Sequence, residues 1–240
     1  LFFLSACDNL NYNEYTSQDE DYMKVTYERV IGLLNNVYTL LDTDFGNTYK
    51  GGMLASACDE AEYAYSKNEI CYFTNGRWSP SPPLSNTWST SYKAIQICNE
   101  YLDNYQGLTF DELKLDPDYK KNMFRYNNTF NEARLLRAYF YFNLVRQYGD
   151  VPYFTEMASL ETVNTLERTP AQEILKNIMD ECDAMAKVLP EDYSKLGTTG
   201  YDEPGRVNKY VALALKARIA LYAASPLFNT TNDKQLWLKV

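Results

Sequence analysis

The chain has 240 residues, of which 23 are Lys or Arg and 32 are Asp or Glu, so its formal net charge is −9. It contains no histidine, which excludes serine–histidine–aspartate catalysis, cysteine–histidine catalysis and zinc sites with histidine ligands. The negative charge disfavours binding to nucleic acid, which needs clustered cations. The most unusual count is 22 tyrosines. Some of these rings must fill a core, and a ring with a hydroxyl tip also suits a wet binding surface.

The first seven residues form a short apolar run that ends in Cys7. A membrane span needs about 20 residues, so this run is typical of the end of a secretory signal. Residues 4–7 resemble a bacterial lipobox, in which the cysteine thiol takes up a diacylglycerol. We expect residues 1–7 to be the remainder of a lipoprotein signal, Cys7 to be the lipid attachment site and residues 8–18 to be a polar tether. The alternative is an ordinary apolar strand that contains a cysteine.

The other cysteines show no Cys-x-x-Cys spacing for metal or redox chemistry. Cys98 and Cys182 fall on apolar helix faces, which indicates core thiols. The sequence leaves open whether Cys58 and Cys71 form a disulfide. A weak match to a calcium loop begins at Asp42, but its glycine is at position five instead of six and the distal glutamate is missing. We expect neither a metal nor another cofactor.

Apolar residues recur at steps of three and four in several segments, which predicts amphipathic helices. These segments are residues 19–42, 87–105, 118–148, 169–189 and 207–224. The helix at 118–148 has two apolar faces, so we expect it to lie buried between neighbours. The helix after it has the clearest start signal, with Thr169 as N-cap, Pro170 at the first helical position and Gln172 completing a capping box.

Strand-like alternation is confined to a short segment near Ile70 to Thr74. Helix ends are marked by Pro152, Pro190 and Pro226, at spacings of 38 and 36 residues. A tetratricopeptide helix pair repeats every 34 residues, and an irregular bundle without repeats fits these spacings equally well. The predicted fold class is all-α, an irregular helical bundle with tetratricopeptide-like helix pairs and long connecting loops.

Four blocks of sequence carry a family resemblance. Residues 131–152 resemble the hallmark helix of the SusD/RagB family of outer-membrane nutrient-binding lipoproteins. Residues 88–99, 168–190 and 205–226 resemble other blocks of that family, in the same order. Members of the family are usually much longer than this chain, which ends without a helix cap. The resemblance therefore implies that residues 19–240 are an incomplete N-terminal helical domain whose C-terminal half is absent.

The resemblance also implies a function. It implies a protein without catalytic activity that faces the cell exterior at the outer membrane and is held there by its lipid anchor alone. Tetratricopeptide-like helices would pack against a SusC-like TonB-dependent transporter. Loops on the other side would capture an oligosaccharide or polysaccharide, which the protein would deliver to that transporter.

The connection between the first two predicted helices has the composition of a sugar-binding surface. Sugars need flat aromatic faces for their C–H groups and polar side chains for their hydroxyls. Long ordered loops are often functional, and prolines stiffen this one before any ligand binds. We predict that a glycan stacks on Trp78 and that polar contacts come from Arg77, Asn75, Asp59, Tyr65 and Asn86. The alternative is that this loop only caps the helices.

The family blocks themselves predict structure more than ligand contact. Trp88 and Tyr92 share an apolar stripe, which indicates core. We expect buried or partner-facing ion pairs from three arginines of the hallmark helix, Arg134, Arg137 and Arg146.

Two other functions remain compatible with the sequence. A helical-repeat scaffold would assemble other proteins and bind no saccharide. A glycoside hydrolase would need paired acids, for which Asp59 and Glu62 could lie one helical turn apart.

Overall fold

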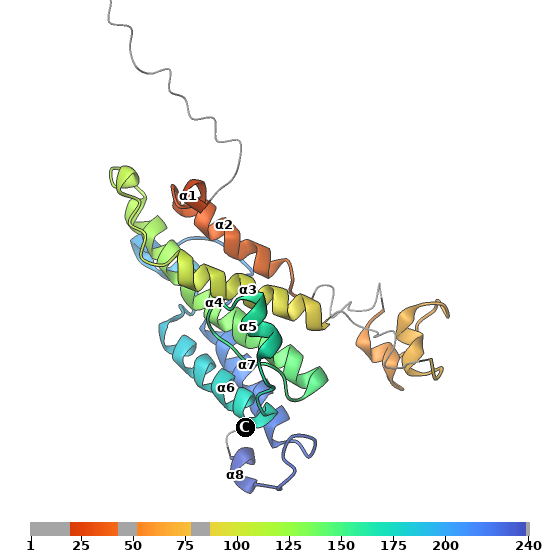
Figure 1. Cartoon of the computed structure of the whole chain (residues 1–240). Coiled ribbons are helices and arrows are strands. Elements are labelled where there is room, and N and C mark those ends of the chain that lie inside the picture. The colour runs from red at the N-terminus through yellow and green to blue at the C-terminus, as the bar shows by residue number, and fades with distance from the viewer. Residues whose placement is uncertain (1–19, 43–51, 78–86, 239–240) are drawn as a thin grey trace, which may run out of the picture.

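The computed structural model describes residues 20–42, 52–77 and 87–238 (Figure 1). The described residues confirm the all-α prediction, since their only regular elements are α-helices and short 3₁₀ helices. An isolated antiparallel bridge joins Val151 to Thr169. The α-helices are α1 (Glu20–Met23), α2 (Tyr27–Tyr38), α3 (Thr87–Asn104), α4 (Tyr119–Tyr148), α5 (Leu160–Thr165), α6 (Ala171–Val188), α7 (Lys209–Ala224) and α8 (Lys234–Trp237).

Helix α4 lies at the centre of the bundle (Figure 1). It contacts α2 and α3 as well as α6, and α7 packs on α6. The α3–α4 and α6–α7 pairs are the tetratricopeptide-like pairs of the predicted architecture. Both apolar faces of α4 are buried as predicted, because Leu135 and Leu136 are each 1% exposed and Phe140 is 2% exposed. None of the described helices is long and apolar enough to span a membrane.

The helix predicted at 19–42 is divided into α1 and α2. Thr26 has an extended backbone, with φ −134° and ψ 148°, and its side chain accepts a hydrogen bond from the backbone N–H of Arg29. This is the geometry of an N-cap, which satisfies one of the free N–H groups at the start of α2. A new helix therefore begins after Thr26, and the buried apolar stripe begins with it at Tyr27.

The predicted capping box at the start of α6 is wrong. Pro170 occupies the N-cap position, and the N–H of Ala171 donates to Asp150 Oδ1 at 2.8 Å. Thr169 donates its own N–H to the carbonyl of Val151. The Gln172 amide donates to the carbonyl of Ala223 at the end of α7 and to that of Phe228 beyond it. A carboxylate from the loop after α4 thus takes the place of the threonine cap, which local sequence could not reveal.

Candidate functional site

The described part of the predicted glycan-binding segment, residues 52–77, has a small core of its own. Its two 3₁₀ helices, η1 (Leu54–Ala57) and η2 (Glu69–Phe73), pack on each other to one side of the helical bundle (Figure 1). Ile70 is fully buried, yet it is not part of the cluster that forms the main core. Gly52 approaches Ile70 so closely that a Cβ at this position would lie 2.8 Å from the Ile70 Cβ. Residues 52–77 are therefore held largely by their own contacts.

The strand-like alternation near Ile70 does not form a strand, because η2 covers these residues. The Asn68 side chain accepts a hydrogen bond from the backbone N–H of Ile70 at 2.9 Å. This local side-chain bond favours a turn over a strand. Consequently η2 presents its residues on a short turn and not on alternating faces of a strand.

Four of the predicted glycan-binding residues, Asp59, Tyr65, Asn75 and Arg77, are exposed in the structure. Tyr65 is 73% exposed, and its ring centroid lies 5.8 Å from that of Tyr63. Asn75 Oδ1 accepts a hydrogen bond from the backbone N–H of Arg77 at 3.1 Å, so these two residues lie together. Trp78 and Asn86 lie outside the described residues.

Asp59 does not join this pair. Within the described residues it forms no hydrogen bond or ion pair with Asn75 or Arg77. The helical turn proposed for a catalytic pair is also wrong, since the chain from Asp59 to Glu62 is not helical. Both carboxylates are exposed, so the structure gives them no arrangement typical of a glycosidase.

The two cysteines of residues 52–77 are free thiols. Cys58 Sγ lies 3.3 Å from the carbonyl oxygen of Ala55, and Cys71 Sγ lies 3.7 Å from that of Tyr65. Cys58 and Cys71 therefore do not form a disulfide in this structure, a point that the sequence left open.

Of the two aromatic residues in the 88–99 block, Tyr92 packs against the core as predicted, whereas the core prediction is wrong for Trp88. The Trp88 ring lies 4.9 Å from that of Tyr92 and 5.1 Å from that of Tyr148, at the end of α4. The Tyr92 hydroxyl donates to the carbonyl of Pro152 at 2.8 Å. Trp88 is 37% exposed, so it lies at the edge of the core.

The three arginines of α4 behave differently from one another. Arg134 forms the predicted ion pair, donating from Nε and Nη2 to the two carboxylate oxygens of Glu181 at 2.6 and 2.9 Å. Arg137 instead donates to the carbonyl of Thr155 at 2.6 Å. Neither Arg137 nor Arg146 forms an ion pair with a described carboxylate, so a partner-facing ion pair stays a prediction for these two.

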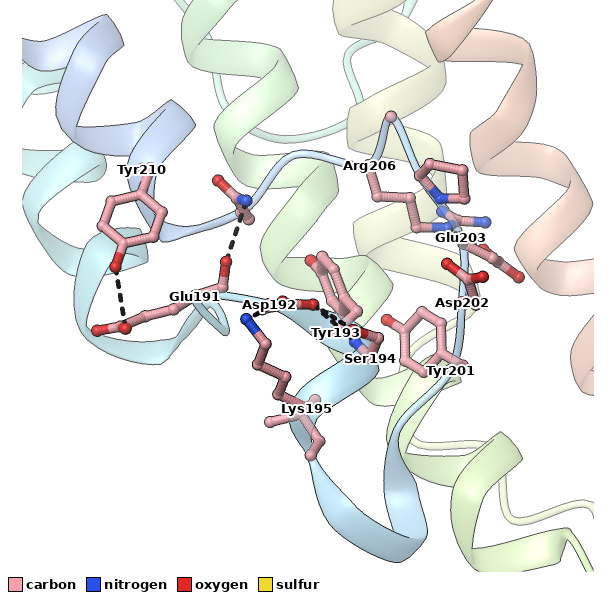
Figure 2. A pocket seen from close by; sticks show the side chains of 14 residues that line it. Glu191, Asp192, Tyr193, Ser194, Lys195, Tyr201, Asp202, Glu203, Arg206 and Tyr210 are labelled. Carbon is pink, nitrogen blue, oxygen red and sulfur yellow. Dashed lines mark hydrogen bonds and ion pairs between the residues drawn. The ribbon is translucent and has the colours of Figure 1, made fainter.

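A polar cleft of about 680 Å³ lies in front of the N-terminus of α7. Its walls come from residues 191–196, residues 201–206 and the first turn of α7. Figure 2 shows Tyr210 at one side, Tyr201 and Asp202 at the other, and Lys195 between them. This volume falls within the range of about 300–1,000 Å³ that is usual for small-molecule sites.

Hydrogen bonds fix the charged side chains at the rim of this cleft. The side chains of Ser194 and Lys195 hydrogen-bond Asp192 and hold the pKa of its carboxyl at about 2. Lys209 and then Tyr210 lower the pKa of Glu191 in the same way. The Tyr210 hydroxyl donates to Glu191 Oε2 at 3.0 Å, and Lys209 Nζ lies 2.7 Å from Oε1. Both carboxylates are therefore ionised at neutral pH, and the Tyr210 ring is held in place.

A buried ion pair supports the cleft from inside. Arg206 lines the cleft, and its Nη1 lies 2.9 Å from Oε2 of Glu132 on α4. Glu132 is 0% exposed and also accepts hydrogen bonds from the hydroxyl of Tyr38 at 2.7 Å and the amide of Asn128 at 3.2 Å. Burial raises the pKa of Glu132, and the positive charge of Arg206 opposes this rise. The pair thus joins α2, α4 and the loop before α7.

Sequence reasoning missed both partners of the Glu132–Arg206 pair. They occur in two of the family blocks, residues 131–152 and 205–226. The sequence did contain one signal: Glu132 is the single carboxylate among the apolar residues of α4. Buried charges are rare unless they are paired, so this carboxylate indicates a buried partner of opposite charge. No sequence rule pairs it with an arginine more than seventy positions away.

The structure adds no support for a metal site. Within the described residues, no group of three or more His, Cys, Asp or Glu side chains could hold a metal ion. Asp42, the first residue of the calcium-loop match, accepts a hydrogen bond from the Tyr139 hydroxyl at 3.3 Å. Residues 43–46 of that match lie outside the described residues.

The protein is thus an all-α scaffold of tetratricopeptide-like helix pairs, and its loops expose aromatic and polar side chains. A family model described as SusD-like, starch-binding and associating with the outer membrane matches residues 8–221. The chain therefore belongs to the SusD-like family, as the sequence blocks predicted.

Known proteins with similar sequence or fold fit this membership. The SusD-like protein P25 of Formosa agariphila is 28% identical over 142 residues, which cover 57% of this chain and 23% of that protein. A SusD-like carbohydrate-binding protein of Bacteroides fragilis has a similar fold, with a TM-score of 0.64 at 21% identity over 90% of this chain and 41% of its own. A laminarin-binding SusD-like protein gives a TM-score of 0.60 at 22% identity, over 88% of this chain and 42% of its own. The chain thus spans less than half the length of each.

Proposed function

We propose that this protein is a cell-surface glycan-binding lipoprotein that captures an oligosaccharide or polysaccharide and delivers it to a SusC-like TonB-dependent transporter. It binds its ligand without catalysing a reaction. The observation that carries the proposal is the unit at residues 52–77, which presents aromatic and polar side chains to solvent beside a rigid helical scaffold. Support for the ligand class comes from the family description as starch-binding and from the carbohydrate-binding and laminarin-binding proteins of similar fold.

The chemistry of this unit suits a saccharide. The Tyr65 ring is largely exposed, so its apolar face is free to cover sugar C–H groups. Arg77 supplies several N–H donors on a planar group, and the neighbouring Asn75 side chain supplies both a donor and an acceptor. Adjacent ring hydroxyls need such closely spaced donors and acceptors. Trp78 follows Arg77 directly and is proposed as the main stacking surface.

Isothermal titration of the intact protein against soluble polysaccharides, starch and laminarin among them, tests the proposal. Trp78→Ala should weaken binding at least about tenfold, because truncating an aromatic anchor at a binding surface has effects of this size. Trp237→Ala is the matched control, since Trp237 is 47% exposed on α8, in a different part of the chain. Equal affinity for wild type and Trp78→Ala would remove Trp78 from the site.

The same titrations separate the alternatives. A protein that binds no polysaccharide but captures other proteins through its helices would be a scaffold, and the glycan proposal would fail. Release of reducing sugar that stops on Asp59→Asn or Glu62→Gln would identify a hydrolase. We expect binding without release of sugar.

The lipid anchor and the transporter need tests in cells. Residues 4–7 support Cys7 as the lipidated residue, and the family description supports an association with the outer membrane. In an outer-membrane bacterium that expresses the full-length protein, labelled palmitate should enter the wild type and not Cys7→Ala, which should leave the membrane fraction. A TonB-dependent transporter should copurify with the wild type. Membrane retention of an unlabelled Cys7→Ala protein would contradict the anchor.

A further inference from the structure

The cleft before α7 is separate from the predicted glycan-binding segment. Its walls come from residues 191–196 and 201–206 together with Asn208 and Tyr210, none of which belongs to residues 52–77. It is also held in shape, because the Glu132–Arg206 pair ties one wall to α4. A pre-formed cleft loses less conformational entropy when a ligand binds than a loop that must first become ordered.

One side of the cleft is an oriented aromatic ring. Tyr210 is 56% exposed, and its hydroxyl is bonded to Glu191, which is itself held by Lys209. The hydroxyl end of the ring is thus fixed while much of its surface stays open to the cleft (Figure 2). The ring provides an apolar surface on which a sugar can stack, and little side-chain entropy is lost on binding because the ring is already held in place.

The rest of the cleft supplies groups for hydroxyls. Asp202 is exposed and forms no hydrogen bond or ion pair within the described residues, so both carboxylate oxygens are available as acceptors. Lys195 has an 80% exposed side chain, and its ammonium group, 2.9 Å from Asp192 Oδ2, keeps further donors free. The cleft thus combines an aromatic ring with a free acceptor and free donors, the groups that suit the C–H face and the hydroxyls of a pyranose ring.

The charge of the cleft limits which saccharides fit. Four carboxylates line it, and three of them are ion-paired within the described residues: Glu191 with Lys209, Asp192 with Lys195, and Glu203 with Arg206 and Arg125. Asp202 has no such partner, so it leaves an uncompensated negative charge in the cleft. An anionic sugar would meet this negative field, whereas a neutral sugar would not. The lining therefore favours neutral over uronate-containing or sulfated chains.

From these observations we infer that the cleft is a second saccharide-binding site of this protein, selective for neutral oligosaccharides, with Tyr210 as its stacking surface and Asp202 as its principal acceptor. The inference rests on the proposed function, since it assigns the same class of ligand to a surface that shares no residue with residues 52–86. A chain with two such sites would hold a long polysaccharide more firmly than either site alone.

Amide chemical shifts of the intact, isotope-labelled chain test the inference during titration with maltohexaose and with laminarihexaose. Trigalacturonate serves as the anionic comparison. Binding in the cleft should shift amides at 191–210 independently of those at 52–86. Tyr210→Ala should weaken the response at 191–210 about tenfold and leave the response at 52–86 intact. Tyr210→Phe keeps the ring but loses the hydrogen bond to Glu191, so its response at 191–210 should lie between those of wild type and Tyr210→Ala. Tyr65→Ala is the control that leaves 191–210 unaffected.

The outcomes separate this inference from the proposed function. Shifts at 52–86 alone would overturn the second site and leave the proposed function standing. Shifts at 191–210 that persist in Tyr210→Ala would also overturn the assignment, and an equal response to trigalacturonate would overturn the selectivity. No shift with any neutral saccharide would refute both, whereas shifts in both regions, with only those at 191–210 lost in Tyr210→Ala, would support both.

Discussion

Arg206→Met should destabilise the fold strongly, because it removes the cation that pairs with the buried carboxylate of Glu132. The Glu132 side chain is 0% exposed and that of Arg206 is 8% exposed, so solvent cannot replace the lost charge. Removing one partner of a buried ion pair costs about 3–5 kcal/mol. Glu132 would keep hydrogen bonds from Tyr38 at 2.7 Å and Asn128 at 3.2 Å. Because these two donors still stabilise the buried carboxylate, we expect the free energy of unfolding to fall by about 3 kcal/mol, the lower end of that range.

The loss should depend on pH with a definite sign. Burial raises the pKa of Glu132 in the folded state, and Arg206 limits that rise. In Arg206→Met the folded pKa therefore increases further above the unfolded value. A group with a raised folded pKa binds more protons when folded, so stability falls as pH rises from the unfolded pKa through the folded one. The destabilisation should accordingly be larger at pH 7.5 than at pH 5.

Urea unfolding followed by circular dichroism measures both effects. The double variant Glu132→Gln/Arg206→Met removes both charges, and it should recover about 2 kcal/mol relative to the sum of the single variants. Lys176→Met is the matched control, since Lys176 pairs with Asp180 on the exposed face of α6 and should be indistinguishable from wild type. A loss below about 1 kcal/mol for Arg206→Met, or the same loss at both pH values, would refute the reasoning.

Three further outcomes follow from single positions. Burial raises the pKa of the Cys98 and Cys182 thiols to about 12, so at pH 8 a thiol reagent should modify exposed Cys58 in the folded protein and those two only after unfolding. Gly149→Ala should lower the free energy of unfolding in urea by about 1–2 kcal/mol, because φ is +66°, a conformation that strains any residue with a side chain. No neighbour would contact the new methyl group, so the strain is not offset by new packing. Ile70→Ala should make residues 52–77 sensitive to limited proteolysis while the main unfolding midpoint stays in place.

The long helices could be predicted from sequence because one local property determines them. Helix α4 was expected at 118–148 and is found at Tyr119–Tyr148, and α3 was expected at 87–105 and is found at Thr87–Asn104. In both, apolar periodicity extends over several turns and thus outweighs errors at single positions. The misplaced boundaries depend on hydrogen bonds instead. The start of α6 is fixed by Asp150, a tertiary partner that no local pattern identifies.

The candidate site was predictable only in part. The exposure of Tyr65, Asn75 and Arg77 follows from their place in a polar connection, and the structure agrees. That residues 52–77 form a unit with its own buried residue does not follow, because Ile70 alone carries that core. The cleft was missed for a related reason. Its two walls lack periodicity, and one of them is held by the Glu132–Arg206 contact, which spans 74 positions.

The position of the Glu132–Arg206 pair also explains what the family blocks can and cannot reveal. Glu132 and Arg206 come from two of these blocks, and their pairing fixes how α4 meets the loop before α7. The predicted ligand residues between 59 and 86 lie outside all of the blocks. Substitutions at the ligand residues proposed between 59 and 86 should therefore cost the scaffold little, whereas the loss of either charge should cost it several kcal/mol. Membership of the family thus follows from the residues that hold the helices together, while the ligand residues predicted between 59 and 86 lie on a surface that the family blocks do not determine.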